Sequence, residues 1–215
     1  MAWKIPRIYP ILDASQIPAA GRNEFLRHLG ASLTDAGVTL LEYRNKTGPD
    51  TEIRADAEAL RAAMPGALVK LILDDRADLV DALEFDGVHV DAGDVSVLEA
   101  RRLVGPDRIV GTFGGSDALI PAILNEPADY FAIGPVFATT TKQTDKRPIG
   151  MEGVRRLRME AGPDVTLTAA AGITLETAGA VLDAGASAVA VSAALFRAAD
   201  PAAEFRRWCA TLGLE

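Results

Sequence analysis

The chain has 215 residues, of which 24% are charged and 49% hydrophobic, a balance typical of a globular protein with a sizeable core. Twenty-two Lys and Arg against thirty Asp and Glu give a net charge of −8, which argues against nonspecific nucleic-acid binding. No apolar stretch approaches the ~20 residues of a membrane helix, and Pro6 and Pro10 interrupt the first residues, so no secretory signal is predicted. A single cysteine, Cys209, excludes an intrachain disulfide. We expect a soluble, cytoplasmic protein with one domain, residues 1–215.

Short apolar runs alternate with alanine-rich amphipathic stretches along the chain. The pattern predicts strands at Ile8–Leu12, Thr39–Arg44, Leu68–Leu73, Gly87–Val90, Ile109–Phe113, Tyr130–Ile133, Val165–Ala169 and Ala188–Val191. It predicts helices at Asn23–Ala36, Thr51–Met64, Arg76–Leu83, Val95–Val104, Ser116–Asn125, Gly150–Ala161, Leu175–Asp183 and Pro201–Leu212. Asp94, Thr174 and Asp200 are expected N-caps, and Gly37 and Gly185 are expected to follow helix ends.

Nearly continuous apolar strands separated by helices indicate an α/β fold with a parallel sheet that is covered on both faces. Eight such units close a (β/α)₈ TIM barrel, and they use nearly the whole chain. The alternative is an open doubly wound sheet, which usually carries a glycine-rich loop after its first strand, whereas Asp13-Ala14-Ser15 follows here. In a barrel, functional residues lie at the carboxyl ends of the strands and in the loops that follow them.

Two cations stand at the end of the second predicted strand. Glu42, Arg44 and Lys46 alternate along the chain and therefore share one face at the barrel mouth. Converging cations suit an anionic ligand such as phosphate. The alternative is a strand end whose charges point into solvent.

Carboxylates follow the third and fourth predicted strands. Asp74 and Asp75 end one strand, and Asp94 follows the next one shortly after it ends. Carboxylates beside a cation cluster suit a divalent ion that bridges to phosphate, and Mg²⁺ prefers such oxygen ligands. The alternative role for Asp75 and Asp94 is helix capping, because each precedes a predicted helix.

The longest predicted loop, residues 134–148, follows the sixth strand and carries hydroxyl groups and a cation, in Thr139, Thr140, Thr141 and Lys142. Long loops in compact barrels are usually functional, so an anion-closing loop is favoured over a merely mobile surface loop. Small residues around Gly172 and Ser192 follow the seventh and eighth strands, where many barrels bind phosphate through backbone N–H groups.

Several segments, in order, resemble those of thiamine phosphate synthases. Gly134-Pro-Val-Phe-Ala-Thr-Thr-Thr-Lys142 is similar to the family's GPVFxTxTK segment and is the most specific match. Asp86-Gly-Val-His-Val with Gly93-Asp94 resembles its DGVHLGxxD segment, and Glu42-Tyr-Arg-Asn-Lys46 its QLREK segment. Ala188-Val-Ala-Val-Ser192 is similar to its last strand.

The resemblance implies a Mg²⁺-dependent transferase that joins hydroxymethylpyrimidine diphosphate to a thiazole phosphate and releases thiamine phosphate and pyrophosphate. It implies that Arg44, Lys46 and Lys142 hold the diphosphate and that Asp75 and Asp94 bind Mg²⁺. The substrate-binding residues that it implies are Glu42, Asp74, Phe113, Thr139, Thr140, Thr141, Gly172, Val191 and Ser192. Phosphorylated small molecules are the expected partners, without nucleic acid or membrane, and a homo-oligomer is left open.

Four positions differ from the family's pattern. Glu42 stands in place of Gln, Asp74 in place of Asn, Phe113 in place of Ser and Ala171 in place of Gly. A thiazole tautomerase-like paralogue and a non-catalytic barrel that binds a phosphorylated ligand therefore remain alternatives. Another phosphate-binding isomerase or aldolase would need an interior acid–base residue or lysine, and Lys70 is expected to lie at the surface instead.

Overall fold

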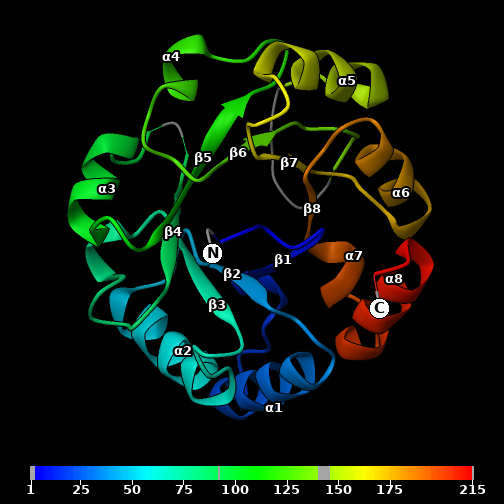
Figure 1. The fold of residues 1–215 in the computed structure, drawn as a ribbon. Helices are drawn as coiled ribbons and strands as arrows, with labels where there is room; N and C mark the ends of the chain where they lie inside the picture. The colour runs from blue at the N-terminus through cyan, green and yellow to red at the C-terminus, as the bar shows by residue number, and fades with distance from the viewer. Residues whose placement is uncertain (1–2, 92, 140–145, 215) are drawn as a thin grey trace.

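Eight parallel strands form a closed barrel in the computed structural model, which describes residues 3–91, 93–139 and 146–214. The strands are β1 (Ile8–Asp13), β2 (Leu40–Arg44), β3 (Lys70–Asp74), β4 (Gly87–Val90), β5 (Ile109–Gly115), β6 (Tyr130–Ile133), β7 (Leu167–Ala170) and β8 (Ala188–Val191). Each strand pairs with the next in the sequence, and β8 pairs with β1, so the predicted TIM barrel is confirmed. Figure 1 looks along the barrel axis and shows the helices outside the ring of strands.

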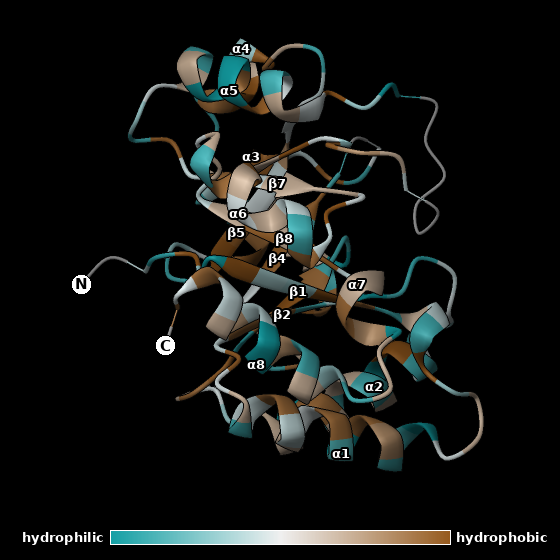
Figure 2. Ribbon diagram, turned by 90° about the vertical axis from the view of Figure 1, so that its right-hand side faces the viewer, coloured by the Kyte–Doolittle hydropathy of each residue, from teal (hydrophilic) through white to brown (hydrophobic). Residues whose placement is uncertain are grey.

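The helices follow the strands around the barrel. They are α1 (Arg22–Asp35), α2 (Asp50–Ala63), α3 (Val97–Val104), α4 (Pro121–Leu124), α5 (Gly150–Ala161), α6 (Leu175–Asp183), α7 (Ala193–Phe196) and α8 (Pro201–Leu212). Hydrophobic residues concentrate in the central strands, as Figure 2 shows. The same view has the N-terminus on one side of the barrel and α7, which follows β8, on the other. Among the described residues, no helix is both long and apolar enough to cross a membrane.

One predicted helix is wrong, and another is much shorter than predicted. In place of 76–83 the chain forms only a short 3-10 helix at Ala77–Leu79, followed by turns. The apolar residues that suggested a helix are buried, but the turns bury them without a continuous run of helical hydrogen bonds. In place of 116–125, β5 runs on to Gly115, and the chain then turns so that Ile120 N–H donates to the carbonyl of Gly114 at 3.0 Å. The helix begins only at Pro121, since a proline disfavours helical geometry in the residue before it but fits the first helical turn.

One predicted N-cap is also wrong. Ser96 caps α3 by accepting from the N–H of Glu99, whereas the carboxylate of Asp94 accepts from the N–H of Asp91 at 2.8 Å. Asp94 is therefore held back toward the end of β4. Thr174 and Asp200 cap α6 and α8 as predicted.

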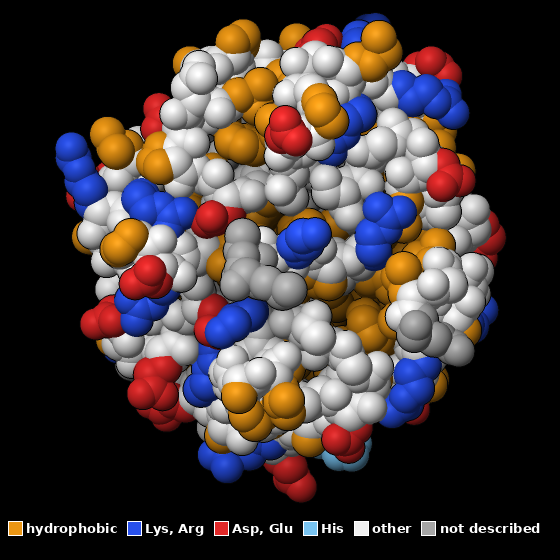
Figure 3. Space-filling model, viewed as in Figure 1, with side chains coloured by type: hydrophobic (Ala, Val, Ile, Leu, Met, Phe, Trp, Pro, Cys, Tyr) orange, Lys and Arg blue, Asp and Glu red, His pale blue; other side chains and the backbone are white. Residues whose placement is uncertain are grey.

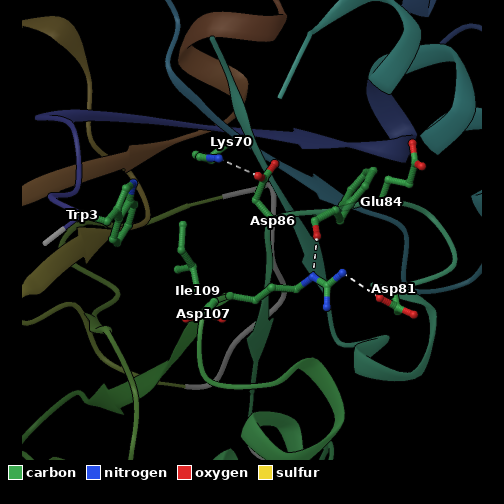
Figure 4. Close-up of a pocket in the computed structure, with 9 residues that line it drawn as sticks. Trp3, Lys70, Asp81, Glu84, Asp86, Asp107 and Ile109 are labelled. Carbon is green, nitrogen blue, oxygen red and sulfur yellow. Dashed lines mark hydrogen bonds and ion pairs between the residues drawn. The ribbon is translucent and has the colours of Figure 1, made fainter. Parts of the chain in front are cut away.

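The amino ends of the strands are closed by packing and ion pairs. Asp86 accepts from Lys70 Nζ at 2.8 Å, from Arg61 Nη2 at 2.6 Å and from the N–H of Leu71 at 3.0 Å. A surface pocket of about 450 Å³ lies here beside Trp3, and Figure 4 shows Lys70 reaching across to Asp86. Figure 3 shows this end of the barrel, with acidic and basic side chains spread around it. Lys70 thus lies at the strand start, as expected, and not at the carboxyl ends of the strands.

Asp56 connects the two outer helices α1 and α2 to the barrel strand β2. It is fully buried on α2 and accepts from Arg22 Nε at 2.7 Å and Nη2 at 2.6 Å. The hydroxyl of Tyr43 on β2 donates to the same carboxylate. A buried carboxylate is tolerated only with such compensation, so this cluster ties the first two helices to the barrel.

We therefore expect Asp56→Ala to lower the free energy of unfolding by roughly 3 kcal/mol, because it removes the buried carboxylate that a guanidinium and a hydroxyl contact. Glu52, 3.4 Å from Arg22, keeps part of the charge compensation. Urea unfolding followed by circular dichroism measures the change. Asp35→Ala, at an exposed position on α1, is the matched control and should change stability little. Equal effects of the two substitutions would contradict this role for Asp56.

Candidate functional site

A cavity of about 740 Å³ opens at the carboxyl ends of the strands. Because every strand runs in the same direction, residues from the whole chain converge there. The predicted site residues that line it are Glu42, Arg44, Asp74, Phe113, Thr139, Gly172, Val191 and Ser192. Thr140, Thr141 and Lys142 lie outside the described residues. Lys46, Asp75 and Asp94 do not line the cavity itself but lie beside it, joined through Asp74.

The two predicted cations meet the predicted carboxylates at this mouth. Arg44 pairs with Asp13 and lies 3.4 Å from Asp74 through its Nε. Lys46 Nζ lies 3.2 Å from Asp74 Oδ2, contacts Asp75 and is 3.9 Å from Asp94 Oδ2. The charges therefore form one cluster and do not point separately into solvent.

Asp75 is held in a strained turn after β3. Its φ of 70° is uncommon for a residue with a side chain, and its N–H donates to the carbonyl of His89 at 2.8 Å. Burial and the nearby carboxyls of Asp94 and Asp74 raise the pKa of Asp75 to about 7, against the opposing effect of Lys46. Crowded carboxyls of this kind favour either a shared proton or a bound cation.

Mg²⁺ fits this pair of carboxyls. Asp75 Oδ1 is buried and has no hydrogen-bond partner within the part of the chain that the structure describes. In the same described residues, no group of three or more His, Cys, Asp or Glu is arranged to hold a metal. A divalent ion would thus take Asp75 and Asp94 and complete its shell with water and phosphate oxygens, which is the coordination that Mg²⁺ prefers.

A chain of polar side chains crosses the floor of the cavity. The hydroxyl of Tyr9 donates to Glu42 Oε2 at 2.6 Å and lies 2.8 Å from the hydroxyl of Tyr130, which is 3.1 Å from His89 Nδ1. Burial, with the nearby Asp74, raises the pKa of Glu42 to about 7 although His89 works against the shift. The second carboxyl oxygen of Glu42, Oε1, has no hydrogen-bond partner among the described residues, so it is available to a ligand in the cavity.

The sequence reasoning missed both tyrosines as site residues. A tyrosine in an apolar strand resembles an ordinary core residue, and Tyr9 and Tyr130 are separated by 121 positions. The sequence did contain one signal for Tyr9. Alternate residues of a strand share a face, and Tyr9 and Asp13 both lie on the face of β1 that lines the cavity. His89 on β4 is buried and also lines the cavity.

The loops after β6 and β7 approach each other closely at Gly172. Gly172 has a φ of 70°, and a Cβ there would lie 2.5 Å from the carbonyl oxygen of Ala138. Only glycine fits such an approach without displacing the backbone. Ala171 has a φ of 73°, which explains why the resembled family has glycine at this position. Directly after β8, Ser192 Oγ donates to Gln16 Oε1 at 3.3 Å.

Comparisons with known proteins agree with this architecture. A family model described as thiamine monophosphate synthase matches residues 8–195. The thiamine-phosphate synthase of Koribacter versatilis is 41% identical over 192 residues, covering 89% of this chain and 90% of that protein. The thiamine-phosphate synthase of Agrobacterium fabrum is 40% identical over 197 residues, covering 90% and 88%.

Solved structures share the fold at lower identity. Thiamine phosphate pyrophosphorylase from Pyrococcus furiosus superimposes with a TM-score of 0.79 at 22% identity, over 96% of each chain. The structure with the same protein name from Bacteroides thetaiotaomicron gives 0.65 at 14% identity, over 98% of this chain and 99% of that one. The extent of the family match and the identity to the curated relatives show that the chain belongs to the thiamine monophosphate synthase family.

Proposed function

We propose that the chain joins hydroxymethylpyrimidine diphosphate to a thiazole phosphate with the help of Mg²⁺. The carbon–oxygen bond to the diphosphate breaks, pyrophosphate leaves with the bonding electrons, and the thiazole nitrogen forms the new bond to carbon. The observation that carries the proposal is the convergence of Arg44 and Lys46 with three carboxylates beside the cavity. Such a cluster can bind an anion and a divalent ion together.

Arg44 and Lys46 would hold the diphosphate and stabilise the negative charge that it gains on leaving. When bound, Mg²⁺ supplies further positive charge to the same group. With Asp75 and Asp94 neutralised by a cation, Lys46 can turn from these carboxylates to a phosphate oxygen. No protein nucleophile is needed, because the amino-pyrimidine ring itself stabilises the positive carbon left behind.

Glu42 would bind the exocyclic amine of the pyrimidine through the oxygen that has no partner. A carboxylate accepts a hydrogen bond from an amine as well as an amide oxygen does, which accounts for its presence where the family pattern has Gln. Tyr9 holds the other oxygen and orients the group. The thiazole phosphate would lie against Gly172, Val191 and Ser192 on the opposite wall, with the ring beside Thr139.

A cytoplasmic location remains a prediction from the sequence.

The direct test incubates the purified protein with both substrates and Mg²⁺ and follows pyrophosphate and thiamine phosphate. The proposal predicts equal amounts of the two products. A folded protein that releases neither would contradict it, and calorimetry with each substrate alone would then identify a non-catalytic binder. Binding of the thiazole phosphate alone would favour a tautomerase-like paralogue.

Asp75→Asn and Asp94→Asn should each lower the Mg²⁺-dependent rate by roughly 100-fold or more, since a bound divalent ion contributes several kcal/mol of charge stabilisation. Pyrophosphate release measured over a Mg²⁺ titration gives this rate. Asp107→Asn, at an exposed position near the amino ends of the strands, is the matched control and should retain the wild-type rate. A wild-type Mg²⁺ dependence in either site variant would show that the metal assignment is wrong.

Glu42→Gln should change how stability depends on pH. The pKa of Glu42 is about 7 when folded and near 4.5 when unfolded, so the folded state binds the proton more tightly. That stabilisation is complete below about pH 4.5 and is lost as the pH rises through about 7. The stability of the variant relative to wild type should therefore rise by on the order of 3 kcal/mol across this range and then level off. Urea unfolding of both proteins at a series of pH values measures the difference between their free energies of unfolding. A difference that does not change with pH would show that the pKa of Glu42 is not raised in the folded protein.

A further inference from the structure

The positive charge already described at the mouth is largely committed to carboxylates. Arg44 is paired with Asp13 and Asp74, and Lys46 is shared among Asp74, Asp75 and Asp94. A diphosphate brings several negative charges to the same place. Every further cation that lines the cavity would therefore add to its binding.

Lys146 is such a cation. It lies in the segment that leads into α5, and it lines the cavity together with Phe113 from β5. Lys146 Nζ lies 3.7 Å from the centre of the Phe113 ring, well within the range of a cation–π interaction. The next residue, Arg147, is exposed and does not line the cavity. The ring thus holds one particular ammonium group at the mouth.

The barrel order places this pair on the side of the diphosphate site. His89 and Val90 of β4 pair with Gly111 and Thr112 of β5, so Phe113 follows on the strand next to the one that leads to Asp94. The loops after β7 and β8, where the thiazole phosphate is placed, lie farther round the barrel from β4. Phe113, and with it the ammonium over its ring, is therefore closer in barrel order to Asp94 than to the wall formed by β8.

We propose that Lys146, held over the ring of Phe113, is an additional binding residue for the diphosphate of the substrate. Phe113 acts as a positioning residue, since it offers an aromatic face to the ammonium and has no polar atom of its own. The pair accounts for Phe113 where the family pattern has Ser, because a lost hydroxyl is replaced by a cation that only an aromatic ring can hold there. This inference rests on the proposed function of the cavity.

Lys146→Met removes the charge but keeps most of the side chain's length. It should weaken the binding of inorganic pyrophosphate in the presence of Mg²⁺ by about tenfold, as for the loss of a hydrogen bond to a charged group, and calorimetry measures this without any turnover. In the synthesis assay it should raise KM for the pyrimidine diphosphate and leave KM for the thiazole phosphate unchanged. Arg147→Met, the adjacent cation outside the cavity, should match wild type in both measurements.

Phe113 provides the second arm. Phe113→Leu should weaken pyrophosphate binding by roughly two- to fivefold, the range of an exposed cation–π interaction, whereas Phe113→Tyr, which keeps an aromatic ring, should bind as wild type does. In the Lys146→Met background, Phe113→Leu should have no further effect, because the ammonium that the ring holds is already gone.

The inference is overturned if Lys146→Met binds pyrophosphate as Arg147→Met does, or if it raises KM for the thiazole phosphate alone. It is also overturned if the effects of Phe113→Leu and Lys146→Met are independent. The KM comparison requires an active wild-type enzyme, whereas the binding comparisons do not. A wild-type protein that binds pyrophosphate but makes no thiamine phosphate would instead refute the proposed function, and the binding measurement would still decide the role of Lys146.

Discussion

Lys46 is the contact on which the arrangement of the mouth depends. Its ammonium draws together Asp74 and Asp75 from the end of β3 and Asp94 from beyond β4. Without a cation between them, carboxylates this close would repel each other, and the turn at Asp75 already carries a strained backbone. The protein thus keeps a dense negative cluster near a site for an anion. A divalent ion can replace this local compensation and release Lys46 toward the ligand.

The same cavity holds charge at two depths. At its floor, Glu42 is almost fully buried, and the tyrosine pair across the barrel fixes its orientation. At its rim, the ammonium of Lys146 rests on an aromatic ring. Apolar and small side chains from β6, β7 and β8 form much of the remaining wall. This division suits two substrates that each carry a flat ring and a phosphate group, because the rings can lie inward while the diphosphate stays near the cations and the thiazole phosphate stays near the loops after β7 and β8.

Much of this could be predicted from the sequence, because the relevant signals were local. The apolar runs located all eight strands within a few residues, and parallel order then placed Arg44, Lys46, Asp75 and Asp94 at one end. The predictions of helices after β3 and β5 were inaccurate for local reasons too: the first helix is absent, and the second is shorter than predicted. Buried apolar residues satisfied the helical pattern without forming the helix, and Pro121 delayed the other one.

Long-range contacts could not be predicted in the same way. Whether Tyr9 meets Glu42 and Tyr130 depends on how the strands close around the barrel, and no spacing in the chain encodes that meeting. The contact of Lys146 with Phe113 could not be predicted either, because the ring lies on β5, the strand next to β6 in the barrel. Asp94 was assigned two alternatives, a metal ligand or a helix cap, and only the position of Ser96 excluded the cap.

The most direct test of the central claim is a crystal structure of the protein with Mn²⁺ and inorganic pyrophosphate, in which anomalous scattering locates the metal. The account predicts a metal peak between the carboxylates of Asp75 and Asp94, with the pyrophosphate against Arg44 and Lys46. A metal bound elsewhere, or a pyrophosphate bound only at the loops after β7 and β8, would contradict it.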